Sequence, residues 1–169
     1  MKLPKYLSVI NRVLGICGLI SLLGMAVLTF IDVILRKFFD SPFQFTMEIS
    51  GVLLVTFIAA AYAYSTSIGR HISIDILTTK FSEKTQNIII VVTDLFSALI
   101  LGLVCWRCIV QGNHLLEVGQ HTPIVEIPFY PFLYFLALSI FVAMVNILIN
   151  AIGTIREMKI ASAQVEKEI

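Results

Sequence analysis

The stretch that decides the fold is Ile127–Ile155, IPFYPFLYFLALSIFVAMVNILINAIGTI, a run of 29 residues without Asp, Glu, Lys or Arg. A helix needs about 20 predominantly apolar residues to cross the hydrocarbon core of a bilayer. Inside that core every backbone N–H and C=O group must find its partner within the protein, which favours a helix over a loop or an open strand. This run therefore predicts a membrane-spanning helix.

Three further runs of similar length lie N-terminal to it. Val13–Ile31 and Ile49–Ile68 carry no charge, and Thr85–Trp106 carries only Asp94. The chain is 58% hydrophobic and 14% charged, whereas a soluble domain is about 25% charged. We expect an all-α integral membrane protein, one domain over 1–169 with four long tilted helices and a tail at 157–169. The expected helices cover about 7–39, 42–68, 83–118 and 128–156.

Basic residues predict the orientation, because cytoplasmic loops are enriched in Lys and Arg. Nine of them fall on the side that holds both termini, and the 119–129 connection has none. Those nine are Lys2, Lys5, Arg12, Arg70, Lys80, Lys84, Arg156, Lys159 and Lys167; Arg36, Lys37 and Arg107 fall on the other side. The pattern predicts that both termini are cytoplasmic.

Several function classes are disfavoured by the same composition. The net charge of +1 gives no basic patch for nucleic acid. In the expected topology His71 lies on one side of the membrane and His114 and His121 on the other, so they cannot share a metal. No nucleophile–base pair, phosphate loop or carboxylate dyad is present. We expect no enzyme activity, no catalytic residue, no metal and no cofactor.

Polar residues inside the spans are candidates for function. Asp32 and Arg36 are one helical turn apart, which suits a local ion pair or a contact with a partner subunit. Small residues share a face with Asp94, and with Asn146 and Asn150, which favours helix packing; Asp94 could instead be a proton site. The packing stripes are Asp94, Ala98, Gly102 and Cys105; Ser139, Ala143, Asn146 and Asn150; and Gly15, Gly18, Ser21 and Gly24.

Cys105 and Cys108 form a C-x-x-C pair in the third expected helix. Redox pairs of this kind need an exposed thiolate of low pKa, usually at a helix start. This pair lies within a continuous helix, and the remaining cysteine, Cys17, is near the other side of the membrane. Packing is the favoured interpretation, and a membrane thiol or quinone redox enzyme is an alternative.

Two connecting segments have distinctive sequences. The first is Gly69–Leu77, GRHISIDIL, which we expect to form a short interfacial segment. The second is Gly119–Pro128, GQHTPIVEIP, at the entry to the last helix. Together with the hairpin between Arg36 and Glu48, they resemble the small membrane subunit, the DctQ-type subunit, of tripartite ATP-independent periplasmic (TRAP) transporters. Two departures are the absence of a Trp shortly before Glu48 and of a Pro-x-Gly element in the last helix.

The resemblance implies a sodium-coupled importer of organic acids in the bacterial inner membrane, with sialic acid or C4-dicarboxylates as substrates. Its implied partners are a large elevator-type membrane subunit, a periplasmic binding protein and membrane lipids. The small subunit would be a scaffold for the large one. A stand-alone proton-coupled exporter is the alternative. We expect the docking residues to lie at the membrane surfaces: Arg36, Glu48, Gly69, Arg70, His71, Asp75, Pro123 and Pro128.

Overall fold

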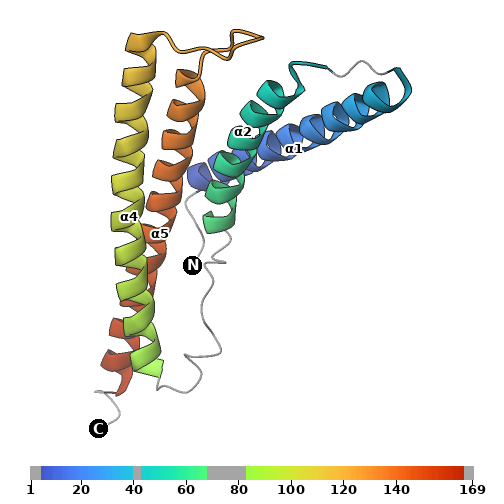
Figure 1. Cartoon of the computed structure of the whole chain (residues 1–169). Helices are drawn as coiled ribbons and strands as arrows, with labels where there is room; N and C mark the ends of the chain where they lie inside the picture. Colours follow the sequence, from blue (N-terminus) through green and yellow to red (C-terminus); the bar gives the residue numbers. More distant parts are fainter. Residues whose placement is uncertain (1–4, 40–42, 68–82, 166–169) are drawn as a thin grey trace.

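Four helices make up most of the computed structural model, which describes residues 5–39, 43–67 and 83–165 (Figure 1). They are α1 (Lys5–Phe39), α2 (Thr46–Ser67), α4 (Glu83–Val118) and α5 (Tyr130–Val165). Each is long and apolar enough to cross a membrane. This confirms the all-α class and the four membrane-spanning helices. The expected interfacial segment after α2 lies outside the described residues.

Two helix ends differ from the expected ranges. Helix α2 begins at Thr46 rather than at 42, because residues 43–45 form a turn whose backbone bonds back to α1. Helix α5 begins at Tyr130 and continues to Val165, so most of the expected tail is helical. Its last turns are rich in Ala, Glu, Lys and Met, which are strong helix formers.

The helices pack in the neighbour order α1, α2, α5, α4. Figure 1 shows α4 and α5 running side by side over most of their lengths, while α1 crosses obliquely from the middle of the molecule outward. Helix α1 meets α5 only near its N-terminal end, and α2 lies between them. The result is an open row of helices.

Small residues explain the close contact between α1 and α2. A Cβ placed on Gly18 would lie 3.0 Å from the Cβ of Ala60, and one on Gly15 would lie 2.9 Å from the Tyr64 ring. Ala60 is fully buried. The predicted glycine stripe of the first helix is therefore its packing face toward α2, as small residues at membrane helix contacts would suggest.

A second seam joins α4 to α5. Its apolar core consists of Ala98, Leu101, Ile140 and Ile147. Gly102 faces the sulfur of Met144, because an added Cβ would lie 3.6 Å from it.

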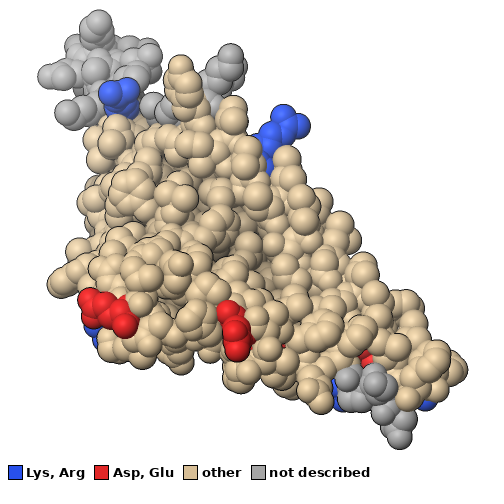
Figure 2. Space-filling model, turned by 90° about the horizontal axis from the view of Figure 1, so that it is seen from above, with Lys and Arg blue, Asp and Glu red and all other residues tan. Residues whose placement is uncertain are grey.

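Most of the remaining helix surface is apolar and exposed. Phe30 of α1 and Trp106 of α4 are 66% and 67% exposed. Figure 2, which looks down on the molecule from above, shows Lys, Arg, Asp and Glu at only a few separate positions, mostly near the margins of that view. The exposed apolar surface of the helices fits lipid or another membrane protein and would be unfavourable in water.

Candidate functional site

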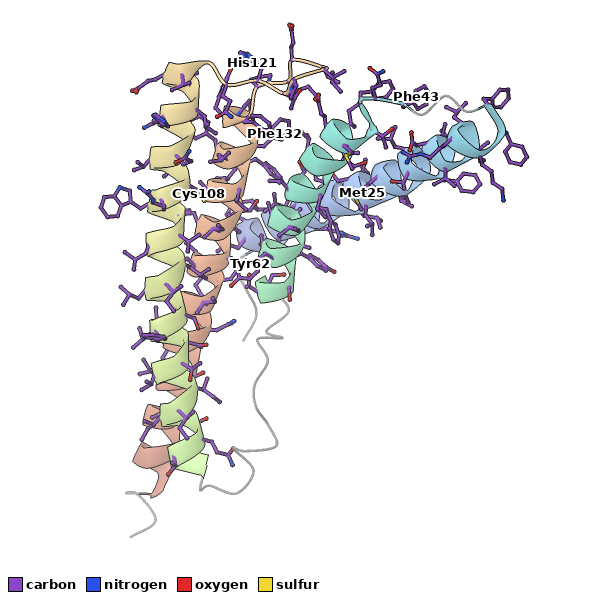
Figure 3. The ribbon with its side chains drawn as sticks, in the orientation of Figure 1. Met25, Phe43, Tyr62, Cys108, His121 and Phe132 are labelled. Carbon is purple, nitrogen blue, oxygen red and sulfur yellow. The ribbon has the colours of Figure 1, made fainter. Side chains whose placement is uncertain are left out.

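Two connections meet at one end of the molecule. The turn before α2 carries Phe43, and the loop 119–129 between α4 and α5 carries His121; Figure 3 shows both at the same end. Each connection is held by a carboxylate that projects from a helix. These two carboxylates, Asp32 and Glu48, organise this end of the chain.

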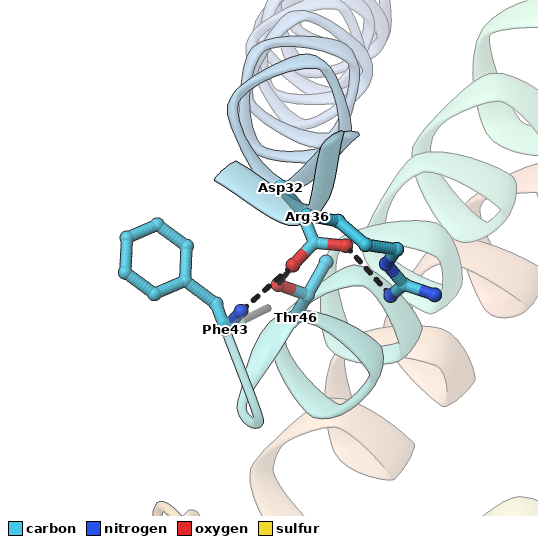
Figure 4. A network of polar contacts seen from close by, with 4 residues as sticks. All are labelled: Asp32, Arg36, Phe43 and Thr46. Atoms are coloured by element: carbon cyan, nitrogen blue, oxygen red, sulfur yellow. Dashed lines mark hydrogen bonds and ion pairs between the residues drawn. The ribbon is translucent and has the colours of Figure 1, made fainter. Parts of the chain in front are cut away.

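Asp32 of α1 fixes the α1–α2 turn (Figure 4). Its Oδ1 accepts the backbone N–H of Phe43 at 2.9 Å and the hydroxyl of Thr46 at 3.1 Å. Its Oδ2 accepts Arg36 Nη2 at 3.0 Å. The carboxylate is buried, whereas the arginine side chain is 66% exposed. The predicted local ion pair is confirmed, and Asp32 additionally closes the start of α2.

Glu48 of α2 binds the other connection. Its Oε1 accepts the N–H of Ile124 at 2.9 Å and its Oε2 accepts the N–H of Val125 at 3.0 Å. Both donors are main-chain groups of the loop 119–129, 76 and 77 residues further along the chain. Hydrogen bonds to an ionised carboxylate are shorter and stronger than neutral ones. Glu48 therefore ties α2 to the loop that joins α4 to α5.

The loop has a defined conformation of its own. Helix α4 ends in a Schellman motif: the Gly119 N–H bonds Leu116 C=O, the Gln120 N–H bonds Leu115 C=O, and Gly119 has φ +65°. The left-handed region suits glycine because it has no Cβ.

Thr122 organises the rest of the loop. Its N–H donates to Ile127 C=O, its C=O accepts the N–H of Glu126, and its hydroxyl accepts the N–H of Ile127. Glu126 adopts φ 55°, which is uncommon for a residue other than glycine. His121 and Pro128 form an isolated antiparallel bridge. The loop is thus a compact unit with Pro123 exposed at its tip and Pro128 half-buried at its base.

A buried polar cluster joins three helices nearer the other end. Asn11 of α1 and Asn146 of α5 exchange side-chain hydrogen bonds of 3.2 Å, and both are almost completely buried. The Asn146 amide also donates to the hydroxyl of Thr66 and the carbonyl of Ala63 in α2. The contacts of Asn146 agree with its predicted packing role.

The other predicted packing residues are partly buried. Gly102 faces α5, and Asn150 and Asp94 are half-buried. Cys105 donates its thiol to the Ala137 carbonyl at 3.4 Å, and Cys108 packs with it against the apolar core. Both thiols are free. Their contacts are those of packing residues.

Four candidates, Gly69, Arg70, His71 and Asp75, lie outside the described residues. Sequence reasoning missed Asn11, Thr46 and Thr122. Asn11 shares a helix face with Gly15 and Gly18, and this stripe was a usable signal. The hydroxyls of Thr46 and Thr122 make hydrogen bonds that depend on how the two short connections fold. No sequence pattern predicts such bonds.

The chain is similar in sequence to known proteins over most of its length. The profile of the family described as "Tripartite ATP-independent periplasmic transporters, DctQ component" matches residues 25–157. A Haemophilus influenzae protein with the provisional name TRAP transporter small permease protein is 30% identical over 124 residues, covering 70% of this chain and 73% of that protein. A second protein of that organism and name is 28% identical over 95 residues, 56% of each chain. The chain therefore belongs to the DctQ family of TRAP transporter components.

Proposed function

We propose that this chain is the small permease subunit of a sodium-coupled, binding-protein-dependent importer and acts as a membrane scaffold for the large transport subunit. The complex would reside in the bacterial inner membrane, with both termini of this chain in the cytoplasm. A periplasmic protein would deliver the substrate. Sialic acid and C4-dicarboxylates are the proposed substrate classes.

The main observation in favour of a scaffold role is that the buried polar side chains bond within this chain. Asp32, Glu48 and Asn146 each bond to groups of this same chain and hold one segment against another. A secondary transporter places such groups around its substrate near the bilayer midplane, often on broken helices. Helices α1, α2, α4 and α5 are continuous instead. Because these polar groups bond within the chain, they favour a rigid scaffold over a substrate-binding site.

The open row of helices supports the same role. Because α4 packs mainly on α5 and α1 mainly on α2, large apolar surfaces of both outer helices are exposed. Part of these surfaces would lie against a second membrane protein, and the rest would contact lipid. At the loop end, the docking surface would be formed or held in place by Arg36, Glu48, Pro123 and Pro128. Gly69, Arg70, His71 and Asp75 are the proposed docking residues after α2.

Uptake by purified components tests the proposal. The large subunit is reconstituted in liposomes with and without this chain, binding protein is added outside, and an inward sodium gradient is applied. We expect uptake only when both membrane subunits are present. A panel of sialic acid and C4-dicarboxylates then identifies the substrate class. Full uptake by the large subunit alone, or by this chain alone, would contradict the scaffold role.

Variants in the segment after α2 test the docking residues. Arg70→Ala and Asp75→Ala should reduce both co-purification of the large subunit and uptake. Lys80→Ala removes a charge from the same connection and is the matched control, for which we expect normal assembly. If Arg70→Ala and Asp75→Ala assemble and transport like the unmodified chain, these residues do not fix the docking.

A further inference from the structure

Arg107 of α4 lies on the helix face that points away from the rest of the molecule. The α4 side chains that meet α5 include Leu101, Cys105 and Cys108. At 100° per residue, Arg107 and Val110 lie on the opposite side of the helix. Helix α4 forms one edge of the row, as Figure 1 shows, so this face belongs to the outer surface.

A shallow groove of about 480 Å³ follows this face. Its lining consists of Leu103, Val104, Trp106, Arg107 and Val110. Four of these side chains are apolar or aromatic, so the guanidinium is the one charged group in the groove lining. Trp106, the single tryptophan of the chain, is 67% exposed beside it.

The guanidinium of Arg107 has no anion in the part of the chain that the structure describes. Arg36 is neutralised by Asp32, but no described carboxylate pairs with Arg107. An arginine within a membrane span is costly unless it is paired or reaches the interface. The counter-ion of Arg107 would therefore come from outside the described residues, at the membrane interface.

The depth of Arg107 suits a lipid phosphate. The next turns of α4 carry Gln111, Asn113, His114 and Glu117, and Asn113 accepts the hydroxyl of Tyr134 at 2.6 Å. This belt of polar groups marks the level where α4 enters the interfacial region. Arg107 lies four residues below Gln111, about 6 Å along the helix axis. A long arginine side chain can extend that far toward the headgroups.

We propose that this groove binds an anionic phospholipid. Its phosphate would accept hydrogen bonds from the Arg107 guanidinium, whose planar donors match phosphate oxygens. One acyl chain would lie along Leu103 and Val110, beside the exposed Trp106 indole. Charge complementarity and the apolar floor favour a lipid, because a soluble anion would gain nothing from the groove walls.

Native mass spectrometry of the full-length chain in mild detergent tests this site. Phosphatidylglycerol and phosphatidylcholine are titrated separately, and bound lipid is counted per chain. We expect Arg107→Gln to weaken phosphatidylglycerol binding by at least about tenfold, which corresponds to about 1.4 kcal/mol, because the variant loses the charge-assisted hydrogen bonds to the phosphate. Arg107→Lys should retain part of the binding, and phosphatidylcholine should bind more weakly throughout.

Two further variants separate charge from shape. Lys37→Gln removes an exposed cation near the turn end of α1 and should leave binding unchanged. Val110→Trp fills the groove, keeps the guanidinium, and should weaken binding. If Arg107→Gln binds phosphatidylglycerol as the unmodified chain does, the proposal is wrong. It is equally wrong if that variant keeps the lipid and loses a co-purifying membrane protein, because Arg107 would then pair with a protein carboxylate.

Discussion

The two reciprocal hydrogen bonds between Asn11 and Asn146 allow a quantitative test of how the helices are held together. The perturbation is a double-mutant cycle of Asn11→Ala, Asn146→Ala and the two combined. Each side chain donates one hydrogen bond to the other at 3.2 Å, and their exposed fractions are 1% and 0%. The cycle isolates the interaction between the two residues from their separate packing.

The expected coupling follows from the number of bonds. Side-chain hydrogen bonds between membrane helices average about 0.6 kcal/mol and reach about 1.7 kcal/mol. Two reciprocal bonds therefore predict a coupling energy of about 1–2 kcal/mol. Asn146→Ala alone should cost more, about 2–4 kcal/mol, because it also removes bonds to α2 and leaves the buried Asn11 amide without a partner.

Reversible unfolding in mixed micelles, followed by far-ultraviolet circular dichroism, measures these free energies. Asn150→Ala is the matched control, because Asn150 lies one turn further along α5 and is half-buried. We expect it to cost less than Asn146→Ala. A coupling energy within about 0.5 kcal/mol of zero, the usual range for independent sites, would refute the interaction.

Three further perturbations test other contacts. Gly18→Val should separate α1 from α2 and lower the thermal unfolding temperature, because its Cβ would lie 3.0 Å from Ala60; Gly51→Val, with nothing within 4 Å, should not. Glu48→Gln should speed amide hydrogen exchange at the tip of the loop 119–129 without affecting the core of α4. If the loop amides of the variant exchange as slowly as those of the unmodified chain, Glu48 does not hold the loop. Gly119→Ala should cost about 1–2 kcal/mol of unfolding free energy because of its left-handed φ, and an unchanged stability would contradict that conformation.

The number of helices could be predicted from the sequence because the length of an uncharged run reports directly on its ability to span a bilayer. The range predicted for α4 agrees with its bounds, Glu83–Val118. The start of α2 was missed, because Asp32 draws residues 43–45 into a turn through a contact from another helix. Local capping patterns contain no information about that carboxylate.

The order of the helices in the row could not be predicted. Each membrane-spanning helix is apolar on all its faces, so hydrophobic patterning does not show which face meets lipid and which meets protein. The glycine stripe of α1 identified a packing face but not α2 as its partner. Glu48 was recognised as a candidate at the membrane surface, but its hydrogen-bond donors are main-chain N–H groups, which have no sequence signature. Its proposed contribution to docking remains a prediction.

This chain is proposed to support a larger transport subunit in the membrane. The most direct test of this role is purification of the tagged chain from native membranes in mild detergent, followed by mass determination of the intact particle. We predict that a much larger hydrophobic subunit co-purifies in a fixed ratio and that uptake requires both chains. A particle that contains only this chain, with substrate transport intact, would contradict the account.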